Sequence, residues 1–391
     1  MQQSGGTNFV LVSVEQLALL TQLTRNHTDR EEVMSFYFED EKTHTRTTHE
    51  INLRHDSNKI ADEDGNTWLH LGARAGSDRM IRGFIEQGGK DLDLNVRNRA
   101  DETPLIVATK ASRQKIVEIL LEGGADVNAC QRLTNDQGWT ALHLAAMKGD
   151  TQIVKVLLEK DAKITEADLY TAYERTCCQG CTPLIAACIK GNEESIKMLV
   201  HAGDNPHQVL SDGTNALHHA LANRSNPGVP VHLINEYKIN VNQQTKDGRT
   251  PLFYATTREL ITSLIENGAD VNHIADRDGW SPLYCASLSC SQENIEQIKT
   301  LLEFGANPNL QVKAAALERI TPFEAFARRI GKDSGWRPTP KIVLELTQLF
   351  LTKGAKINSN IKGYFDLYLE IHKIPELRKL IRENYDSCLL S

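Results

Sequence analysis

The stretch Gly138-Trp139-Thr140-Ala141-Leu142-His143 is one copy of a phrase that recurs along this chain of 391 residues. In other copies a proline follows the threonine, as in Glu102-Thr103-Pro104-Leu105. Threonine is a favoured helix N-cap, and proline at the next position already has the helical φ angle and lacks an amide hydrogen that the first turn does not use. Each copy therefore predicts the start of a helix. Eight copies place the cap at Thr67, Thr103, Thr140, Thr182, Asn215, Thr250, Ser281 and Thr321.

A second helix is predicted after each of these starts. Apolar residues follow at helical spacing, for example Ile116, Val117, Leu120 and Leu121. The pattern then ends at Gly123-Gly124-Ala125-Asp126-Val127-Asn128, a phrase repeated at Asn267-Gly268-Ala269-Asp270-Val271-Asn272. Glycine can take the left-handed conformation that ends a helix. Helix pairs that recur at intervals near ~33 residues indicate a stacked repeat protein.

These two phrases together resemble the ankyrin-repeat family over about residues 62 to 358. The resemblance implies an all-α repeat solenoid of about eight ankyrin repeats, each a helix-turn-helix with a β-hairpin-like finger. It also implies a concave face, made by the fingers and first helices, on which partners bind. Three residues depart from the family phrase, so their local geometry stays open: Trp68 for Pro, Asn215 for Thr and Asp101 for the finger Gly.

The ends of the chain lack the phrase and are expected to cap the stack. A solenoid needs polar-faced terminal units because its last repeats have no neighbour. We therefore divide the chain into an N-terminal cap at 1–60, partly mobile and with a short helix at Val14 to Leu23, a repeat domain at 61–358, and a C-terminal helical cap at 359–391. Helices in that last cap are expected around Tyr364 to His372 and Pro375 to Asn384.

Three fingers are enlarged, one of them at Pro308 to Arg319. The other two are consecutive, at Ala129 to Gln137 and Thr165 to Gln179. They should project side by side and are a first candidate for a specific binding surface. The alternative is that the insertions have no function, since surface loops tolerate insertion well. Two further insertions, Asn223 to Pro230 and Gly331 to Pro340, are rich in turn-forming residues and are predicted to be loops between the helices of a repeat.

The candidate partner-binding residues follow from the resemblance. Trp139, Arg249 and Trp280 occupy the variable position after the finger glycine, which in the family faces the concave side. Trp and Arg commonly anchor interfaces, although each ring could simply pack across its neighbouring finger. Charged residues expected at the fingertips, either as contacts or as isolated solvated charges, complete the set: Asp212, Lys246, Asp247, Arg277 and Asp278.

The densest thiol cluster is Cys177-Cys178-Gln179-Gly180-Cys181, with Cys188 beyond it. Thiolates could bind zinc, but no second regularly spaced pair follows, so we predict no metal and no cofactor. A Cys- or Cys/His-based site near Cys177 to Cys181, in an enzyme or enzyme recruiter, is the alternative function. Histidines at the phrase position, which in the family tie finger and helix backbones together, are expected to be structural: His70, His143 and His218.

Other enzyme classes find no support in the motifs. The sequence has no G-x-x-x-x-G-K-[ST] phosphate loop, no H-E-x-x-H helix and no G-x-S-x-G elbow. We therefore predict a noncatalytic protein-interaction scaffold.

Composition sets the remaining expectations. Forty-four Lys and Arg against 51 Asp and Glu give a net charge of −7, which argues against nucleic acid as a partner. No stretch is apolar enough to span a membrane, and the first basic residue is Arg25, so we expect no secretory signal. We expect a cytoplasmic monomer with reduced cysteines. Irregular stacks of this type also resemble effectors that intracellular bacteria deliver into host cells, and an endogenous cytosolic adaptor is the open alternative.

Overall fold

The computed structural model divides the chain into two compact units, Met1–Asn205 (unit 1) and Pro206–Ser391 (unit 2). Each unit is described by itself. The residues that the structure describes are 33–39, 46–52, 59–87, 92–131, 138–170, 177–222, 226–289, 291–313, 319–331 and 338–389.

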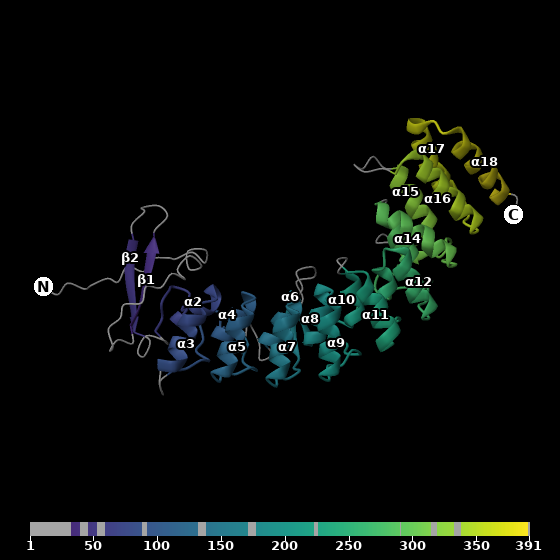
Figure 1. Cartoon of the computed structure of the whole chain (residues 1–391). Coiled ribbons are helices and arrows are strands. Elements are labelled where there is room, and N and C mark those ends of the chain that lie inside the picture. Colours follow the sequence, from purple (N-terminus) through teal and green to yellow (C-terminus); the bar gives the residue numbers. More distant parts are fainter. Residues whose placement is uncertain are drawn as a thin grey trace. The chain divides into compact units, whose positions relative to one another are not determined.

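Unit 1 is a double row of helices (Figure 1). The first helices of successive repeats contact one another in order, from α2 through α4 and α6 to α8, and the second helices do so from α3 through α5 and α7 to α9. The bounds are α2 Trp68–Ala75, α3 Asp78–Gln87, α4 Pro104–Lys110, α5 Gln114–Glu122, α6 Ala141–Lys148, α7 Thr151–Glu159, α8 Pro183–Lys190 and α9 Glu193–His201.

Among its described residues, unit 1 has three strand pairs. The enlarged fingers are antiparallel hairpins, β3 (Cys130–Gln131) with β4 (Trp139–Thr140), and β5 (Ala167–Tyr170) with β6 (Cys177–Cys181). A third pair, β1 (Val33–Glu39) with β2 (Arg46–Asn52), was not expected from the sequence. The helix expected at Val14 to Leu23 lies outside the described residues, as do the tips of both enlarged fingers.

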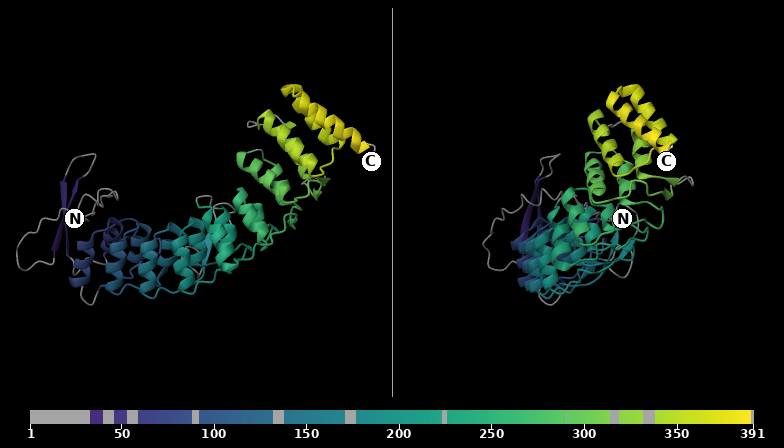
Figure 2. Two further views of the ribbon diagram at one scale, coloured as in Figure 1. Left: turned by 45° about the vertical axis from the view of Figure 1, so that its right-hand side comes forward. Right: turned by 90° about the vertical axis from the view of Figure 1, so that its right-hand side faces the viewer.

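Unit 2, taken by itself, also has two rows of helices (Figure 2). In its first row α13 contacts α15 and α15 contacts α17, while η2 lies against α10 and α13; in its second row α11, α12, α14, α16 and α18 follow one another. The bounds are α10 Ala216–Ala222, α11 Gly228–Tyr237, η2 Pro251–Phe253, α12 Arg258–Glu266, α13 Pro282–Ser287, α14 Gln292–Glu303, β7 Val312–Lys313, β8 Arg319–Ile320, α15 Pro322–Gly331, α16 Pro340–Thr352, α17 Ser359–His372 and α18 Pro375–Leu389.

Unit 2 corrects two expectations from the sequence. The phrase at Thr250 starts only a single 3-10 turn, η2, instead of a full first helix. Helix α11 begins at Gly228, so the loop predicted at Asn223 to Pro230 is shorter than expected. The two C-terminal helices are confirmed and longer than predicted.

The three departures from the phrase do not disturb the fold. Helix α2 starts at Trp68 without a proline. The Asn215 side chain still caps α10, because its Oδ1 accepts a hydrogen bond from the His218 amide at 3.2 Å. Asp101 takes the left-handed conformation of the glycine that it replaces, with φ of 57°.

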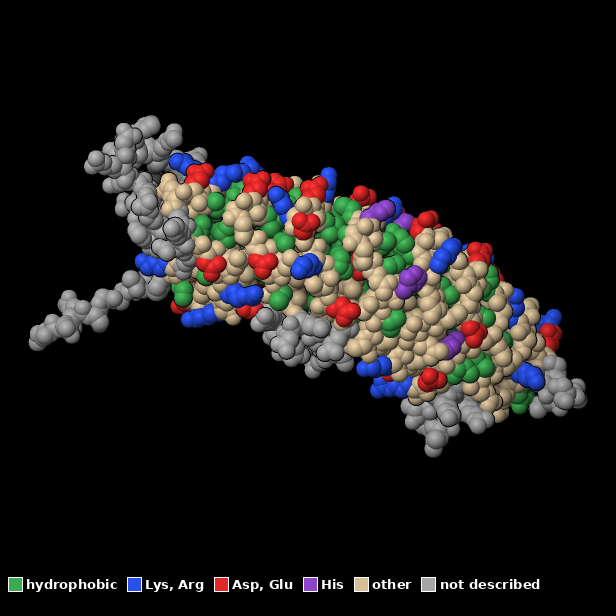
Figure 3. All heavy atoms as spheres, turned by 90° about the horizontal axis from the view of Figure 1, so that it is seen from below, with side chains coloured by type: hydrophobic (Ala, Val, Ile, Leu, Met, Phe, Trp, Pro, Cys, Tyr) green, Lys and Arg blue, Asp and Glu red, His purple; other side chains and the backbone are tan. Residues whose placement is uncertain are grey.

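The core of each unit lies between its two rows of helices. In unit 1 the leucine of every phrase is fully buried, at Leu69, Leu105, Leu142 and Leu184. Burial of such a side chain contributes about 1.5–3 kcal/mol. On the face shown in Figure 3, Lys and Arg side chains are mixed with Asp and Glu, and no large field of one sign is present among the described residues.

Candidate partner-binding surface

Three histidines of the phrase each tie a first helix to the next finger. The Nδ1 atom of His70 accepts a hydrogen bond from the Thr67 amide at 3.1 Å, and its Nε2 atom lies 2.9 Å from the Glu102 carbonyl oxygen. Equivalent Nε2 contacts join His143 to the Cys181 carbonyl at 3.2 Å and His218 to the Arg249 carbonyl at 3.4 Å. The predicted structural role of these histidines is confirmed.

Burial keeps these imidazoles neutral. It lowers the pKa of His143 and of His218 to about 4, although the carbonyl contacts oppose the shift. A neutral ring can accept at Nδ1 and donate at Nε2, which is the arrangement that the two backbones require. These histidines are therefore unavailable as catalytic bases without breaking the stack.

An asparagine ladder fixes the other end of each finger in unit 2. The Oδ1 atom of Asn242 accepts a hydrogen bond from the Asp270 amide at 3.0 Å, and that of Asn272 accepts one from the Asn307 amide at 2.7 Å. Asn272 is the last residue of Gly268-Ala269-Asp270-Val271-Asn272, and Asn242 ends the related stretch Ile239-Asn240-Val241-Asn242. Histidine and asparagine bonds together hold successive fingers in register and so place the residues at their bases.

Arg249, Asp278, Trp280 and Tyr284 form one contiguous group in unit 2, here called the Arg249 cluster. Arg249 Nη2 donates to Asp278 Oδ2 at 2.8 Å, and its guanidinium lies over the Trp280 ring at 5.3 Å. The Trp280 and Tyr284 rings are 5.5 Å apart. Arg249, Asp278 and Trp280 are half-buried, whereas Tyr284 is buried in a core cluster with Ile320. The cluster thus presents a positioned arginine and indole at the surface.

Of the predicted fingertip charges, Asp278 belongs to this cluster, and the other four residues make contacts of their own. Arg277 forms an ion pair with Asp247 at 2.7 Å. The Lys246 amide donates to the Asp212 carbonyl at 2.7 Å, and the Asp212 carboxylate accepts from Thr214. Asp247, Arg277 and Asp278 are therefore ion-paired, although the Arg277 side chain remains largely exposed. An exposed ion pair of this kind contributes little to stability.

Trp139 belongs to the other unit and to a different environment. It lies in β4, pairs with Gln131 across the hairpin, and is half-buried with its ring 5.6 Å from His143. The predicted set of site residues therefore falls into two parts, Trp139 in unit 1 and the other seven in unit 2.

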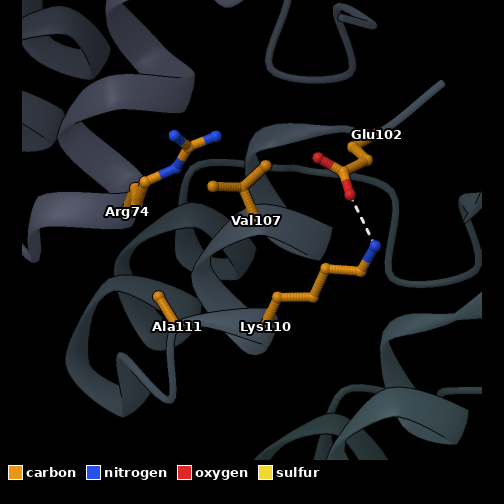
Figure 4. Close-up of a pocket in the computed structure, with 5 residues that line it drawn as sticks. All are labelled: Arg74, Glu102, Val107, Lys110 and Ala111. Atoms are coloured by element: carbon orange, nitrogen blue, oxygen red, sulfur yellow. Dashed lines mark hydrogen bonds and ion pairs between the residues drawn. The ribbon is translucent and has the colours of Figure 1, made fainter. Parts of the chain in front are cut away.

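Unit 1 also contains a hollow of about 290 Å³ that the sequence did not predict. The residues that line it are Arg74, Glu102, Val107, Lys110 and Ala111 (Figure 4). The signal that could have found it is the last turn of the first helices. Each of α2, α4, α6 and α8 carries its one charged residue there, and that residue is basic.

The structure describes the side chains of only some of the cysteines in and near the second enlarged finger. Cys181 and Cys188 are fully buried, and burial raises the pKa of the Cys188 thiol well above its usual range. The side chains of Cys177 and Cys178 lie outside what the structure describes. Among the described residues, no group of three or more His, Cys, Asp or Glu is arranged to hold a metal ion.

Within the described part of the chain, no helix is both long and apolar enough to cross a membrane.

Stacked helix pairs, hairpin fingers and the histidine bonds between them define a repeat solenoid. The family model described as "Ankyrin repeats (3 copies)" matches residues 40–131, 90–168, 129–209 and 217–312. The chain belongs to the ankyrin-repeat family.

Several curated proteins are similar to this chain. An ankyrin repeat protein of Acanthamoeba polyphaga mimivirus is 27% identical over 242 residues, covering 61% of this chain and 30% of that protein. The nuclear factor NF-kappa-B p105 subunit of Gallus gallus is 30% identical, with coverage of 54% and 21%. The human B-cell lymphoma 3 protein is 32% identical, with coverage of 54% and 45%. The chain thus spans less than half of the length of these relatives.

Solved ankyrin repeat domains also match the structure. That of human ASB11 aligns with a TM-score of 0.48 and 22% identity, covering 61% of this chain and 97% of that domain. That of Bcl-3 aligns with a TM-score of 0.43 and 26% identity, covering 61% and 100%.

Proposed function

We propose that this protein is a noncatalytic scaffold that holds a protein partner on the first helices and fingers of unit 2, with the Arg249 cluster as the anchor. The class of function follows from ankyrin repeats, which bind proteins. The observation that supports this particular surface is the half-buried guanidinium of Arg249 between Asp278 and Trp280. Arginine and tryptophan dominate the binding energy of many interfaces, and a pre-positioned pair loses little side-chain entropy on binding.

The cluster also has capacity left for a partner. Arg249 donates to Asp278 through Nη2, and its side chain is still 31% exposed. Arg277 is largely exposed and stands in the neighbouring finger. A partner that offers an acceptor and an apolar side chain to this surface would satisfy the guanidinium and cover the indole.

The test is affinity purification with mass spectrometry from the cytosol in which the protein acts, comparing the wild type with Arg249→Ala and Trp280→Ala. Both variants should lose a partner that the wild type recovers. Arg258→Ala is the matched control, because it removes an exposed ion pair with Glu303 from α12 in the second row. Equal recovery by folded Arg249→Ala and Trp280→Ala would contradict this surface.

Cytoplasmic location and delivery into a host cell remain predictions from the sequence. The same purification separates the two settings, since an effector would recover host proteins and an endogenous adaptor would recover proteins of its own cell. Trp139 and the enlarged fingers of unit 1 form a second proposed contact region, tested by Trp139→Ala in the same assay.

A further inference from the structure

The first helices of unit 1 form a row with charge of one sign. Helices α2, α4, α6 and α8 contain no acidic residue, and the charged residue in the last turn of each is Arg74, Lys110, Lys148 or Lys190. In unit 2, α10, η2 and α13 contain no Lys, Arg, Asp or Glu. Cations near a helix C-terminus complement the helix dipole, which accounts for their position. It does not account for the hollow between two of them.

Arg74 and Lys110 line this hollow from consecutive helices (Figure 4). Val107 and Ala111 add an apolar part to its lining, and the Arg74 side chain extends beside Val107 (Figure 4). The volume, about 290 Å³, is enough for a side chain of a partner but small for an independent ligand.

One carboxylate already occupies the edge of the hollow. Glu102 Oε1 accepts a hydrogen bond from Lys110 Nζ at 2.5 Å, and Glu102 Oε2 accepts one from the side-chain Nδ2 of Asn98 at 3.0 Å. Gln131 also donates to Glu102 Oε1 at 3.4 Å and accepts from Lys110 at 2.7 Å. Burial alone would raise the pKa of Glu102, but these hydrogen bonds and the charges of Lys110 and Arg74 lower it.

The guanidinium of Arg74 completes the charge balance. Among the described residues no carboxylate is ion-paired with it, and Arg113 contacts only its backbone carbonyl, at 3.1 Å. The hollow therefore holds two cations and one anion. A second carboxylate would neutralise it, and the fork of a guanidinium can bind a carboxylate through two hydrogen bonds.

We propose that the hollow between Arg74 and Lys110 binds an acidic side chain from an extended protein segment. The carboxylate pairs with Arg74 and shares Lys110 with Glu102, while its methylene groups lie on Val107 and Ala111. The site goes beyond the proposed function, because it names a class of partner for unit 1. It depends on none of the residues of the Arg249 cluster.

Fluorescence anisotropy with a labelled twelve-residue peptide of alternating Glu and Ser tests the proposal, with a Gln-Ser peptide as the neutral probe. The wild type should bind the acidic peptide and not the neutral one. Arg74→Gln and Lys110→Gln should each weaken binding about tenfold, the effect of losing one charged contact. Lys197→Gln, which removes an exposed lysine from α9, is the matched control and should bind as the wild type does.

Glu102→Gln gives the sharpest readout, because it keeps the shape and removes the internal competitor. Binding of the acidic peptide should become tighter, an outcome that a merely structural role for Arg74 or Lys110 would not produce. Equal binding of both peptides, equal binding by folded Arg74→Gln, or stronger binding of an oligouridine of the same length would overturn the proposal. Trp280→Ala, which tests the proposed function, should leave peptide binding unchanged.

Discussion

The Nε2 atom of His143 lies 3.2 Å from the carbonyl oxygen of Cys181, in the finger that leads to the next repeat. Its Nδ1 atom lies 2.9 Å from the Thr140 hydroxyl, so one buried ring joins a helix cap to the neighbouring repeat. Because the His143 side chain is fully buried, water cannot take the place of either hydrogen bond when one is lost.

His143→Ala should therefore lower the free energy of unfolding by about 2–4 kcal/mol, because it leaves buried polar groups unsatisfied and opens a cavity. Urea titration at pH 8 measures the change. His201→Ala, at an exposed position in α9, is the control and should change stability by less than about 0.5 kcal/mol. A similar small effect at both positions would contradict the bridging role.

Stability should fall on mild acidification. Burial lowers the pKa of His143 and of His218 from 6.5 to about 4 in the folded state. Between these values the unfolded chain binds protons that the folded chain does not, so stability is full above pH 6.5 and is lost as the pH falls toward 4. The loss should be about 2–3 kcal/mol for each histidine. Urea midpoints from pH 8 to pH 4.5 measure it, and His143→Gln should flatten the slope.

Much of the fold could be predicted because its signals are local. A threonine cap followed by proline fixes a helix start at Thr103 and Thr182 from chemistry within one turn. The full helix predicted after Thr250 did not form, and the reason is also local. The next helix cap, Thr257, follows so soon that a two-turn helix and its connecting turn cannot fit before it.

The candidate site could be predicted only as a set of positions. The resemblance predicted that Arg249 and Trp280 lie on the concave face, but it did not predict the guanidinium over the indole, since that contact joins two repeats. The hollow beside Arg74 escaped for the same reason: the side chains that line it come from two helices and a finger. Contacts between repeats depend on side-chain conformations that no single phrase encodes.

Two glycines with similar backbone angles should respond very differently to alanine. Gly248 has φ of 81°, and a Cβ there would lie 2.3 Å from the backbone nitrogen of Asp276 in the next finger. Gly268 has a φ of 91°, and a Cβ at this position would have no neighbouring atom within 4 Å. Gly268→Ala should cost about 1–2 kcal/mol, the strain of the left-handed conformation alone. Gly248→Ala should cost at least about 2 kcal/mol more, since backbone must move. Thermal unfolding of both variants checks the difference, and equal costs would mean that the fingers are not closely packed.

Asp204 stands where other repeats place a buried alanine, and it is only 3% exposed. Its Oδ2 accepts from the Leu184 amide at 2.8 Å, while Oδ1 has no partner among the described residues. Burial raises the pKa of this carboxyl. Asp204→Asn keeps an acceptor, removes the charge, and should stabilise the protein at pH 7 by about 1 kcal/mol.

The pH dependence separates this effect from a simple packing change. The folded state holds the Asp204 proton more tightly than the unfolded state does. The loss of stability that the buried, ionised carboxylate causes in the wild type is therefore full above the raised pKa. It shrinks as the pH falls through that value toward 3.8, the ordinary value of the carboxyl. The difference in urea midpoint between Asp204→Asn and the wild type should therefore narrow on acidification. A constant difference would mean that the carboxyl is not desolvated.

Thiol labelling tests the cysteine-based alternative to a noncatalytic scaffold. Burial raises the pKa of Cys285 to about 12 and that of Cys188 further, and only a thiolate reacts readily with iodoacetamide. At pH 7.5 both should be labelled about a hundredfold more slowly than in the unfolded chain, where a cysteine has a pKa near 8.5. Half-exposed Cys130 serves as the internal reference, read by peptide mass spectrometry. Rapid labelling of Cys188 in the folded protein would show an accessible thiolate beside Cys181 and revive the alternative, whereas slow labelling leaves that helix with the packing role that its complete burial indicates.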